Sequence, residues 1–428
     1  MKHQRIKLFI ICLSLLRLCS LFPISEKGSW YLGDTAHYLH FSSRVCHGDW
    51  GGEPGKAPLY LWFLCALSPN LNYPRLEDNP PPKAAVSAQV ILPLVTQIFL
   101  TSAVGWNLAS FSPLGAVLWI FDPVILAYSL IIMPEALFAS ILMIFLILLA
   151  PIFRSLSLSP QRAVAIGLMA ALCALARTNG LSISLCALAF LLWALRGSKV
   201  ALKRASFACV IFALLLTPRL YWNQTHYGVA GLTHQGDGWI KSVAGVIEND
   251  GKGLDFPNSE RLWWQTHAQN PSASEALTSI LAHPMSTISL CLKGALRVLV
   301  GHVNIEWGSL LSGNTPIGPG FSKPRELRGG FNISPDQKLF WGLWWLGVFS
   351  CLIWTTTAYT FVTRTVARTR LDLFTGFCTF MILMQALMPL AYGEARFRAS
   401  VWPFLIAILV YYRFDKSYYN AKTNKVMI

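Results

Sequence analysis

The stretch MPEALFASILMIFLILLAPIFR, residues 133–154, decides the fold class of this chain. As a helix, its apolar part, 134–153, rises about 1.5 Å per residue and is long enough to cross the roughly 30 Å hydrocarbon core of a bilayer. The whole sequence has the same character, with 54% hydrophobic and only 13% charged residues. This composition excludes an ordinary soluble domain and predicts an all-α polytopic membrane protein.

Further apolar runs of similar length predict about ten transmembrane helices. The runs lie near 7–24, 84–104, 113–131, 134–153, 162–176, 180–196, 205–221, 338–361, 371–390 and 398–412. The first run follows basic residues as a signal peptide would, but it lacks an A-x-A cleavage site. We therefore expect an uncleaved first span.

Lysine and arginine are concentrated in alternate connections between these runs. The basic set is Lys2, Arg5, Lys7, Arg154, Arg162, Arg196, Lys199, Lys203, Arg204, Arg364, Arg368, Arg370, Arg413, Lys416, Lys422 and Lys425. The opposite short connections carry only Arg177, Arg396 and Arg398. The positive-inside rule then predicts a multi-pass protein of the plasma (inner) membrane with both termini cytoplasmic. It also accounts for the net charge of +15 without nucleic acid as a partner.

Three parts follow from this topology: an N-terminal membrane module, 1–221, a large outer loop, 222–337, and a C-terminal module with a cytoplasmic tail, 338–428. The first part includes an outer loop at 25–83. Both outer loops are expected to carry short amphipathic helices. The segment 281–300 has an apolar face with Lys293 and Arg297 on another side, so we expect it to lie in the outer interface.

The ten cysteines show no CxxC pair, and only Cys46 lies clearly in an extramembrane loop. This pattern predicts neither a disulfide framework nor a zinc site. Three nearby histidines, His37, His40 and His47, have a spacing that is not diagnostic of metal binding. We expect no metal; phosphate binding or a place on an amphipathic interface helix are the alternatives for these histidines.

A few charged residues break the charge bias and fall on the outer face, in four separate connections. They are Asp34, Glu135, Arg177, Glu394, Arg396 and Arg398. Each has a simple explanation alone: a helix cap for Asp34, a helix-dipole contact for Glu135, lipid phosphate contacts for the arginines. Because charges at membrane depth are costly and usually face a cavity or a partner, their convergence predicts a shared site.

Glycosyl transfer from a lipid phosphate uses this combination of groups. A carboxylate accepts the proton of an acceptor hydroxyl while that oxygen attacks the anomeric carbon, and fixed cations stabilise the leaving phosphate. Arginine suits the second role because its guanidinium binds phosphate oxygens in bidentate fashion and stays charged.

The order of short motifs resembles the GT-C superfamily of polyprenyl-phosphate-sugar-dependent glycosyltransferases, especially its protein mannosyltransferases and aminoarabinose transferases. The motifs are Asp34 with Tyr38 four residues on, Ala57-Pro58-Leu59-Tyr60, Met133-Pro134-Glu135-Ala136-Leu137-Phe138, Ala176-Arg177-Thr178-Asn179-Gly180, Pro218-Arg219-Leu220-Tyr221-Trp222-Asn223 and Gly393-Glu394-Ala395-Arg396-Phe397-Arg398. The order and the topology carry the resemblance, since no single string is specific. Two departures are that Asp34 is followed by Thr35 rather than a second acid, and that Pro134 precedes Glu135.

The resemblance implies an inverting membrane glycosyltransferase with an extracytoplasmic active site and no cofactor. Its donor would be a polyprenyl-phosphate sugar and its acceptor a glycolipid, glycan or protein. Asp34 would be the general base, with Arg177, Arg396 and Arg398 at the donor phosphate. The supporting residues would be Glu135, Glu394, His37 and Tyr38. The alternatives are a polymerase or ligase of undecaprenyl-diphosphate-linked glycans and a flippase or transporter of lipid-linked sugars.

Overall fold

The computed structural model describes residues 12, 14–17, 19, 35–51, 56–70, 83–105, 119, 122–228, 231–232, 243–245, 247, 273–300, 373–387 and 399–408. Within these ranges the regular structure is helical, and no strand occurs there. The predicted all-α class is confirmed for this part of the chain. The predicted span 338–361 lies outside the described residues.

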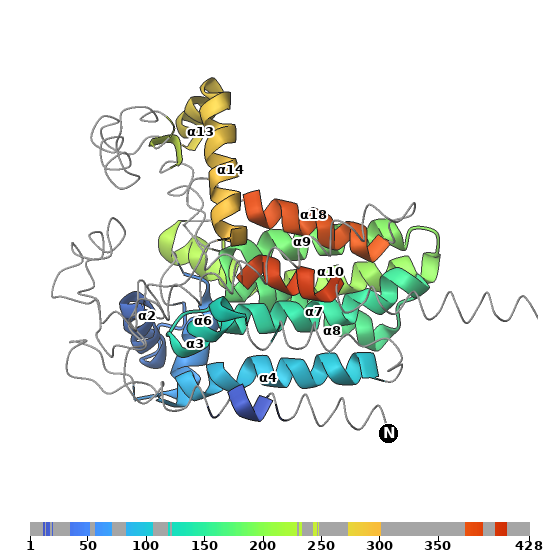
Figure 1. Cartoon of the computed structure of the whole chain (residues 1–428), viewed down its shortest axis with the longest axis horizontal. Helices are drawn as coiled ribbons and strands as arrows, with labels where there is room; N and C mark the ends of the chain where they lie inside the picture. Colours follow the sequence, from blue (N-terminus) through green and yellow to red (C-terminus); the bar gives the residue numbers. More distant parts are fainter. Residues whose placement is uncertain are drawn as a thin grey trace, which may run out of the picture.

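Four consecutive helices form the centre of the molecule (Figure 1): α7 (Glu135–Ser155), α8 (Pro160–Ala176), α9 (Thr178–Ala194) and α10 (Lys199–Tyr227). Their ends follow local sequence signals. The Ser159 hydroxyl accepts a hydrogen bond from Arg162 N ahead of α8, and the Ser198 hydroxyl accepts one from Ala201 N ahead of α10. Gly228 ends α10 with a φ of 67°, a conformation that favours glycine.

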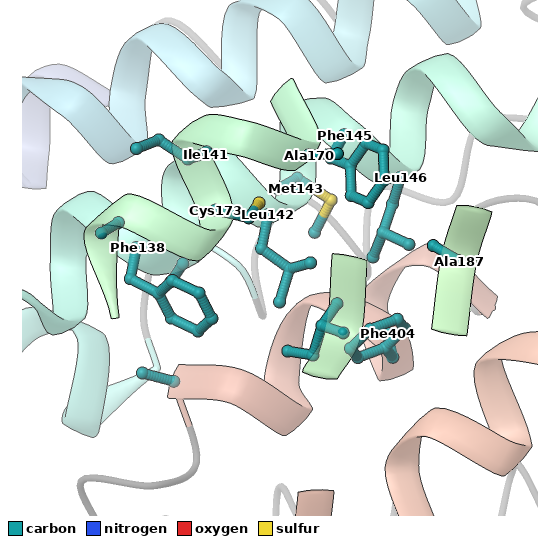
Figure 2. Close-up of a cluster of buried hydrophobic side chains, with 14 of the residues drawn as sticks. Phe138, Ile141, Leu142, Met143, Phe145, Leu146, Ala170, Cys173, Ala187 and Phe404 are labelled. Carbon is teal, nitrogen blue, oxygen red and sulfur yellow. The ribbon is translucent and has the colours of Figure 1, made fainter. Parts of the chain in front are cut away.

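α7 is the most enclosed of these helices. In its most apolar window 83% of the residues are buried, against 28% for α10. Phe138, Leu142 and Phe145 of α7 lie in the cluster of Figure 2, with Cys173 of α8 and Phe404 from the helix Ala399–Ile408. A large apolar residue on nearly every side of α7 suits a helix that neighbours surround.

α8 and α10 pack closely because α8 is rich in small residues. A Cβ atom on Gly167 would lie 2.6 Å from the backbone oxygen of Ala208 in α10. By contrast, large apolar side chains of α10 point away from the bundle, with Phe207, Val210 and Leu214 51%, 51% and 65% exposed. Such a surface is typical of contact with lipid.

α4 (Lys83–Gly105), α6 (Pro123–Leu130), α18 (Leu373–Leu387) and the helix Ala399–Ile408 surround this centre. The prediction of one continuous span over 113–131 is wrong. Asp122 has extended backbone angles, and its carboxylate caps a new helix by accepting hydrogen bonds from Val124 N and Ile125 N. Pro123 follows at the first helical position, where its missing N–H costs nothing.

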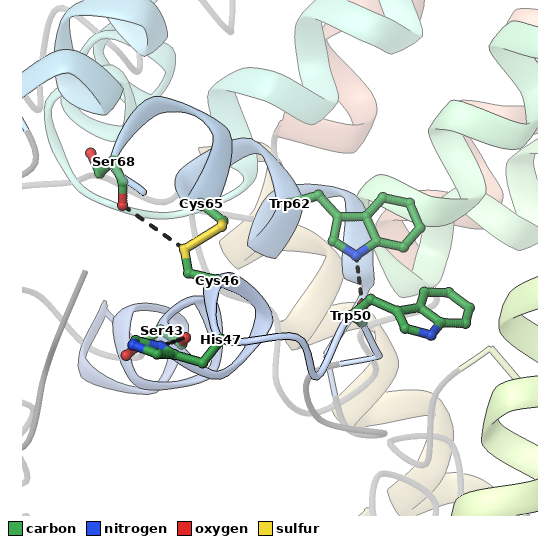
Figure 3. The surroundings of a disulfide bond; sticks show 7 residues. All are labelled: Ser43, Cys46, His47, Trp50, Trp62, Cys65 and Ser68. Atoms are coloured by element: carbon green, nitrogen blue, oxygen red, sulfur yellow. Dashed lines mark hydrogen bonds between the residues drawn. A yellow bond between two sulfur atoms is a disulfide. The ribbon is translucent and has the colours of Figure 1, made fainter. Parts of the chain in front are cut away.

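Two short helices of the predicted first outer loop, α2 (Thr35–Cys46) and α3 (Pro58–Leu67), lie at one end of the bundle (Figure 1). A disulfide between Cys46 and Cys65 joins them (Figure 3). The expectation that the cysteines would form no disulfide is therefore wrong at this pair. Cys65 lies in the apolar run Pro58–Leu67, where the sequence made it resemble a core cysteine.

The large outer loop contributes α13 (Ala273–Ala282) and α14 (Pro284–Val300) in its described part. α14 runs across the direction of the bundle helices and contacts α18 (Figure 1). α14 covers most of the segment 281–300, where one amphipathic helix was predicted, and α13 precedes it.

Two helices of the described part, Glu135–Phe153 and Lys199–Tyr227, are long and apolar enough to cross a membrane. The apolar helices Pro160–Ala176, Thr178–Ala194, Leu373–Leu387 and Ala399–Ile408 are shorter, at 10–17 residues. The structure therefore supports membrane association through two such helices, and the ten-span topology remains a prediction.

Candidate functional site

A buried ion pair joins two of the predicted site residues. Arg177 Nη1 lies 3.2 Å from Glu135 Oε1, and the side chains are 11% and 1% exposed. Glu135 opens α7 directly after Pro134, and Arg177 has extended backbone angles between α8 and α9. Because α7 and α8 are antiparallel and follow one another, the start of one meets the end of the other. The two charges are largely removed from water, so removing either one would leave the other uncompensated and strongly destabilise the folded protein.

The first residue of α2 is fixed to the turn ahead of Glu135. The Thr35 hydroxyl donates a hydrogen bond of 3.2 Å to the backbone oxygen of Ile132, and Thr35 is fully buried. Ile132 is three positions before Glu135 in the sequence. This contact places the start of α2 beside the Glu135 turn. Asp34, the residue that precedes Thr35, lies outside the described residues.

Tyr60 of α3 and Gln89 of α4 form a second polar contact next to this turn. The Tyr60 hydroxyl donates to Gln89 Oε1 at 2.6 Å, and Gln89 Nε2 donates to the backbone oxygen of Ile131 at 2.8 Å. Both side chains are fully buried. Burial raises the pKa of Tyr60 well above its ordinary value, and the nearby charge of Glu135 and then Tyr38 add to the effect. Tyr60 is therefore a neutral hydrogen-bond donor at physiological pH.

Tyr38 belongs to the same cluster through its ring. It meets Tyr60 edge to face, with ring centroids 5.1 Å apart, and Lys56 Nζ lies 5.0 Å from its centroid. Tyr38 is 9% exposed and belongs to the core, and its supporting role at the site stays a prediction.

The start of α9 connects the site to α18. Asn179 Nδ2 donates to Gln385 Oε1 at 3.1 Å, although the two residues are 206 positions apart in the sequence. Gln385 Nε2 in turn donates to the Ser182 hydroxyl at 3.4 Å. The end of the bundle that holds Arg177 thus also holds the end of α18 nearest to residue 387.

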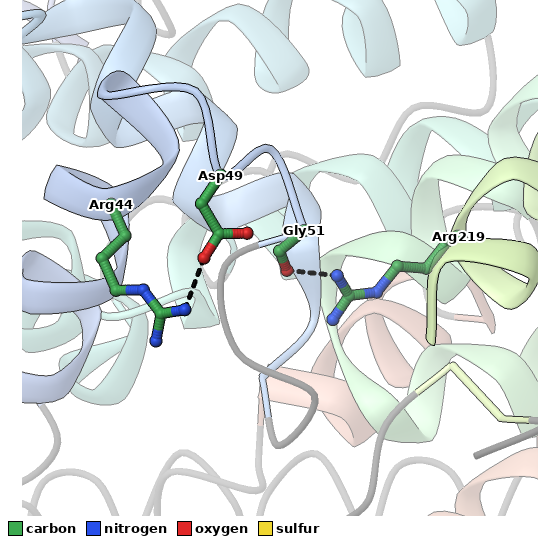
Figure 4. A network of polar contacts seen from close by, with 4 residues as sticks. All are labelled: Arg44, Asp49, Gly51 and Arg219. Atoms are coloured by element: carbon green, nitrogen blue, oxygen red, sulfur yellow. Dashed lines mark hydrogen bonds and ion pairs between the residues drawn. The ribbon is translucent and has the colours of Figure 1, made fainter. Parts of the chain in front are cut away.

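Arg219, near the end of α10, fixes the first outer loop to the bundle (Figure 4). Its guanidinium donates to the backbone oxygens of Gly51 and, at 3.3 Å, Lys56, and the residue is 1% exposed. In the same loop Arg44 forms an ion pair of 2.5 Å with Asp49, with side chains 46% and 26% exposed. Unlike Glu135 and Arg177, this second pair is open to water.

An aromatic row strengthens the same junction. Trp62 Nε1 donates to the backbone oxygen of Trp50 at 2.7 Å (Figure 3), and the Trp50 ring lies 4.8 Å from that of Trp222 in α10. A side chain at Gly51 would overlap the Trp222 indole, so only glycine permits this approach.

One carboxylate oxygen of Glu135 can accept a further hydrogen bond. Glu135 Oε1 faces Arg177, whereas Oε2 is buried and has no hydrogen-bond partner among the described residues. A buried carboxylate oxygen normally accepts a hydrogen bond. Glu135 Oε2 can therefore accept a hydrogen bond from one more donor.

The structure brings together three of the predicted site residues, Glu135, Arg177 and Tyr38. His37 lies on the exposed side of α2, with its ring stacked 6.3 Å from that of Phe41, and does not point into the buried cluster. The predicted site residues Asp34, Glu394, Arg396 and Arg398 lie outside the described residues. No group of three or more His, Cys, Asp or Glu that could hold a metal occurs in the described part of the chain.

Sequence reasoning gave no role in the site to several buried polar residues, and four of them form contacts described above or below: Arg17, Tyr60, Gln89 and Arg219. Arg17 donates a hydrogen bond of 3.1 Å to the Ser129 hydroxyl of α6 and is fully buried. Three of the four stand inside runs counted as apolar, and a single charge or amide within such a run was the available signal.

Comparisons with known proteins identify no relative of this chain. No family model matches the chain, and no curated protein and no solved structure is significantly similar to it.

Proposed function

We propose that this protein is a membrane glycosyltransferase that moves a sugar from a polyprenyl-phosphate donor to an extracytoplasmic glycolipid, glycan or protein. The observation that carries the proposal is the pairing of Glu135 with Arg177 beside the first residue of α2. A guanidinium held at the end of an apolar bundle suits a lipid-linked phosphate. Asp34 is one peptide bond away from Thr35, which contacts the same turn.

The proposed reaction inverts the anomeric centre in one displacement. Asp34 accepts the proton of the acceptor hydroxyl, the acceptor oxygen forms a bond to C1 of the sugar, and the bond from C1 to the phosphate oxygen breaks. The electron pair stays on the leaving polyprenyl phosphate, whose charge Arg177, Arg396 and Arg398 stabilise. Glu135 and Glu394 orient these arginines, and no metal takes part.

A topology of about ten spans accompanies this proposal, with the site outside the cytoplasm. Two observations support the orientation. The basic residues at the far end of the bundle from Arg177 lie at the starts of α8 and α10 and in the turn before α10; they are Arg162, Arg196, Lys199, Lys203 and Arg204. There Arg204 Nη1 of α10 donates to Leu158 O, just before α8, at 2.7 Å. The Cys46–Cys65 disulfide belongs to the opposite end, and disulfides persist in oxidising compartments.

A flippase of lipid-linked sugars is the second candidate, because of Arg17. This residue is buried in the first predicted span and contacts Ser129 of α6. Charged groups inside spans are common along transport pathways. A flippase moves its lipid across the membrane without forming a glycosidic bond. The experiment below therefore also determines on which face of the membrane the lipid-linked sugar accumulates.

The test compares surface glycolipids and glycans of a deletion strain with those of its complemented parent by mass spectrometry. The proposal expects one species to lose the mass of a single sugar, while the corresponding polyprenyl-phosphate sugar accumulates on the outer face of the membrane. Accumulation on the inner face would favour the flippase. Identical profiles in both strains would contradict both candidates.

A further inference from the structure

The hairpin of α13 and α14 has a continuous exposed apolar stripe. Its members are large side chains spaced three or four residues apart, which puts those of each helix on one side of that helix. They are Leu277, Leu281, Met285, Ile288 and Leu292, with exposures of 50%, 69%, 76%, 53% and 56%. A soluble surface rarely presents such a row without a partner.

This stripe is not the side by which the hairpin packs on its own chain. Ala276 and Ile280 of α13 form a separate buried cluster with Val243, Ala244 and Ile247. The hairpin therefore has one apolar side turned inward and a second one turned outward. Ordinary core packing explains the first side only.

Hydrogen bonds at the corner between the helices keep the two halves of the stripe aligned. The Thr287 hydroxyl donates to the backbone oxygens of Ile280, at 3.0 Å, and His283, at 2.9 Å. His283 Nδ1 lies 3.0 Å from the Ser279 oxygen. The two helices, and with them their outward side chains, are thus held in a fixed arrangement.

The position of α14 indicates what covers this surface. Figure 1 shows α14 running across the bundle direction and meeting α18 at the end where α2, α3 and α6 lie. α18 has its own outward apolar side chains, Phe380 and Leu383, which are 52% and 58% exposed. A helix that crosses the bundle direction at this end lies parallel to the membrane plane when the bundle spans the membrane. Lys293, an exposed residue beside the stripe, can reach lipid phosphates.

We propose that the stripe of α13 and α14 is embedded among the phospholipids of the outer leaflet and anchors the large outer loop at the membrane surface. The occupant is lipid, because the stripe adjoins the apolar outside of α18 and a basic residue flanks it. The inference rests on the orientation of the bundle and does not depend on glycosyl transfer.

The test places the photoreactive residue benzoylphenylalanine at single positions of the full chain in membrane vesicles. Positions 285, 288 and 292 belong to the stripe. Ala282 is the matched control, since it is exposed yet lies about 100° around the helix from Leu281. Cross-linked products are then identified by mass spectrometry, in chains that reach the membrane in equal amounts.

The proposal expects phospholipid adducts at the three stripe positions, several-fold more abundant than at position 282. Cross-links within the same chain, cross-links to a second copy, or an absence of adducts would each overturn it. Equal lipid adducts at 282 and 285 would also overturn it, because lipid contact would then not be confined to the stripe. The cross-linking result does not depend on the mass of surface glycans. Failure of this proposal can therefore be distinguished from failure of the proposed function.

Discussion

At the scale of residues, the pair of Glu135 and Arg177 determines what the end of the bundle can do. Its charges are held at 3.2 Å in a place where the carboxylate is only 1% exposed. Buried pairs contribute little net stability compared with apolar side chains, but they fix positions and cannot be broken cheaply. This pair therefore fixes the position of the Arg177 guanidinium at the end of the bundle.

Replacing Glu135 by Gln should destabilise the protein by about 3 kcal/mol, because Arg177 would remain buried without a counter-charge. Chemical unfolding in detergent measures the loss. The double variant Glu135→Leu and Arg177→Met should recover most of it.

The pair Arg44 and Asp49 is the matched control, since its side chains are 46% and 26% exposed. Asp49→Asn should cost less than about 1 kcal/mol, as exposed ion pairs do. Equal losses for Glu135→Gln and Asp49→Asn would contradict the buried-pair account.

Tyr60 gives a pH dependence with a definite sign. Its pKa is raised in the folded state, so folding favours the neutral phenol. The resulting stability is fully present below about pH 10, the pKa of an unfolded tyrosine, and is lost as the pH rises from there through the raised pKa of the folded protein.

Tyr60→Phe should therefore lower stability by about 1–3 kcal/mol at pH 7, because Gln89 Oε1 loses the hydrogen bond that the Tyr60 hydroxyl donates. The difference from the wild type should shrink above about pH 10, because the wild type then bears the cost of a buried phenolate. Unfolding curves at several pH values measure both effects. A difference that stays constant up to strongly alkaline pH would contradict this interpretation.

The predictability of these residues depended on the kind of signal each one gives. Glu135 and Arg177 stand out in the sequence because they break the charge bias, and they do meet. Tyr60 gave no comparable signal, and the amide of Gln89 within an apolar run does not reveal its partner 29 positions away. Such pairings follow from how helices pack, which a single sequence does not specify.

At the scale of elements, the turn between α8 and α9 positions Arg177. Gly180 N donates to Arg177 O at 2.9 Å, and a Cβ atom on Gly180 would overlap the backbone oxygen of Cys173. The turn is tight because glycine occupies this position. Any side chain there would push α9 away from α8.

Gly180→Ala should therefore destabilise the protein by about 1–3 kcal/mol through overpacking against backbone. Gly376 of α18 is the matched control, because nothing lies within 4 Å of its added Cβ. Gly376→Ala should be neutral or stabilise by up to about 1 kcal/mol through helix propensity. Thermal unfolding of the two variants side by side checks this; a harmless Gly180→Ala would show that the turn is looser than described.

The Cys46–Cys65 disulfide holds α2 and α3 together across 19 residues of sequence. Cys46→Ser should lower stability by roughly 3 kcal/mol, the value expected for a loop of this length. It should also expose Cys65 to a membrane-impermeant maleimide, which should not label the wild-type pair before reduction. Cys291→Ser, which removes a free cysteine, is the control. Labelling of wild-type Cys46 without reductant would contradict the disulfide.

Helix positions were predictable where long apolar runs ended at strong signals. The runs 134–153 and 162–176 match α7 and α8 closely, because Pro134 and the pair Ser159 and Pro160 mark their starts. The apolar run 113–131 gave a wrong prediction of one continuous span, because Asp122 and Pro123 begin a new helix inside it. There the capping signal outweighed the hydrophobic pattern, and Asp-Pro within an apolar run was the clue.

At the scale of the whole molecule, the two ends of the bundle differ in character. One end carries the basic turns around Arg162 and Arg204, and the other carries the disulfide, the aromatic row and the buried pair. This polarity is the basis of the proposed orientation of the bundle. The central claim is that Asp34 and Arg177 act together there in glycosyl transfer.

The most direct test of this claim is glycan mass analysis of a deletion strain complemented with Asp34→Asn. Glu275→Gln, which removes an exposed carboxylate of α13, serves as the control, and both chains must reach the membrane in wild-type amounts. We expect the control to restore the missing sugar and Asp34→Asn to leave it absent, with the chain folded and the donor accumulating. Full restoration of the sugar by a folded Asp34→Asn chain would contradict the account.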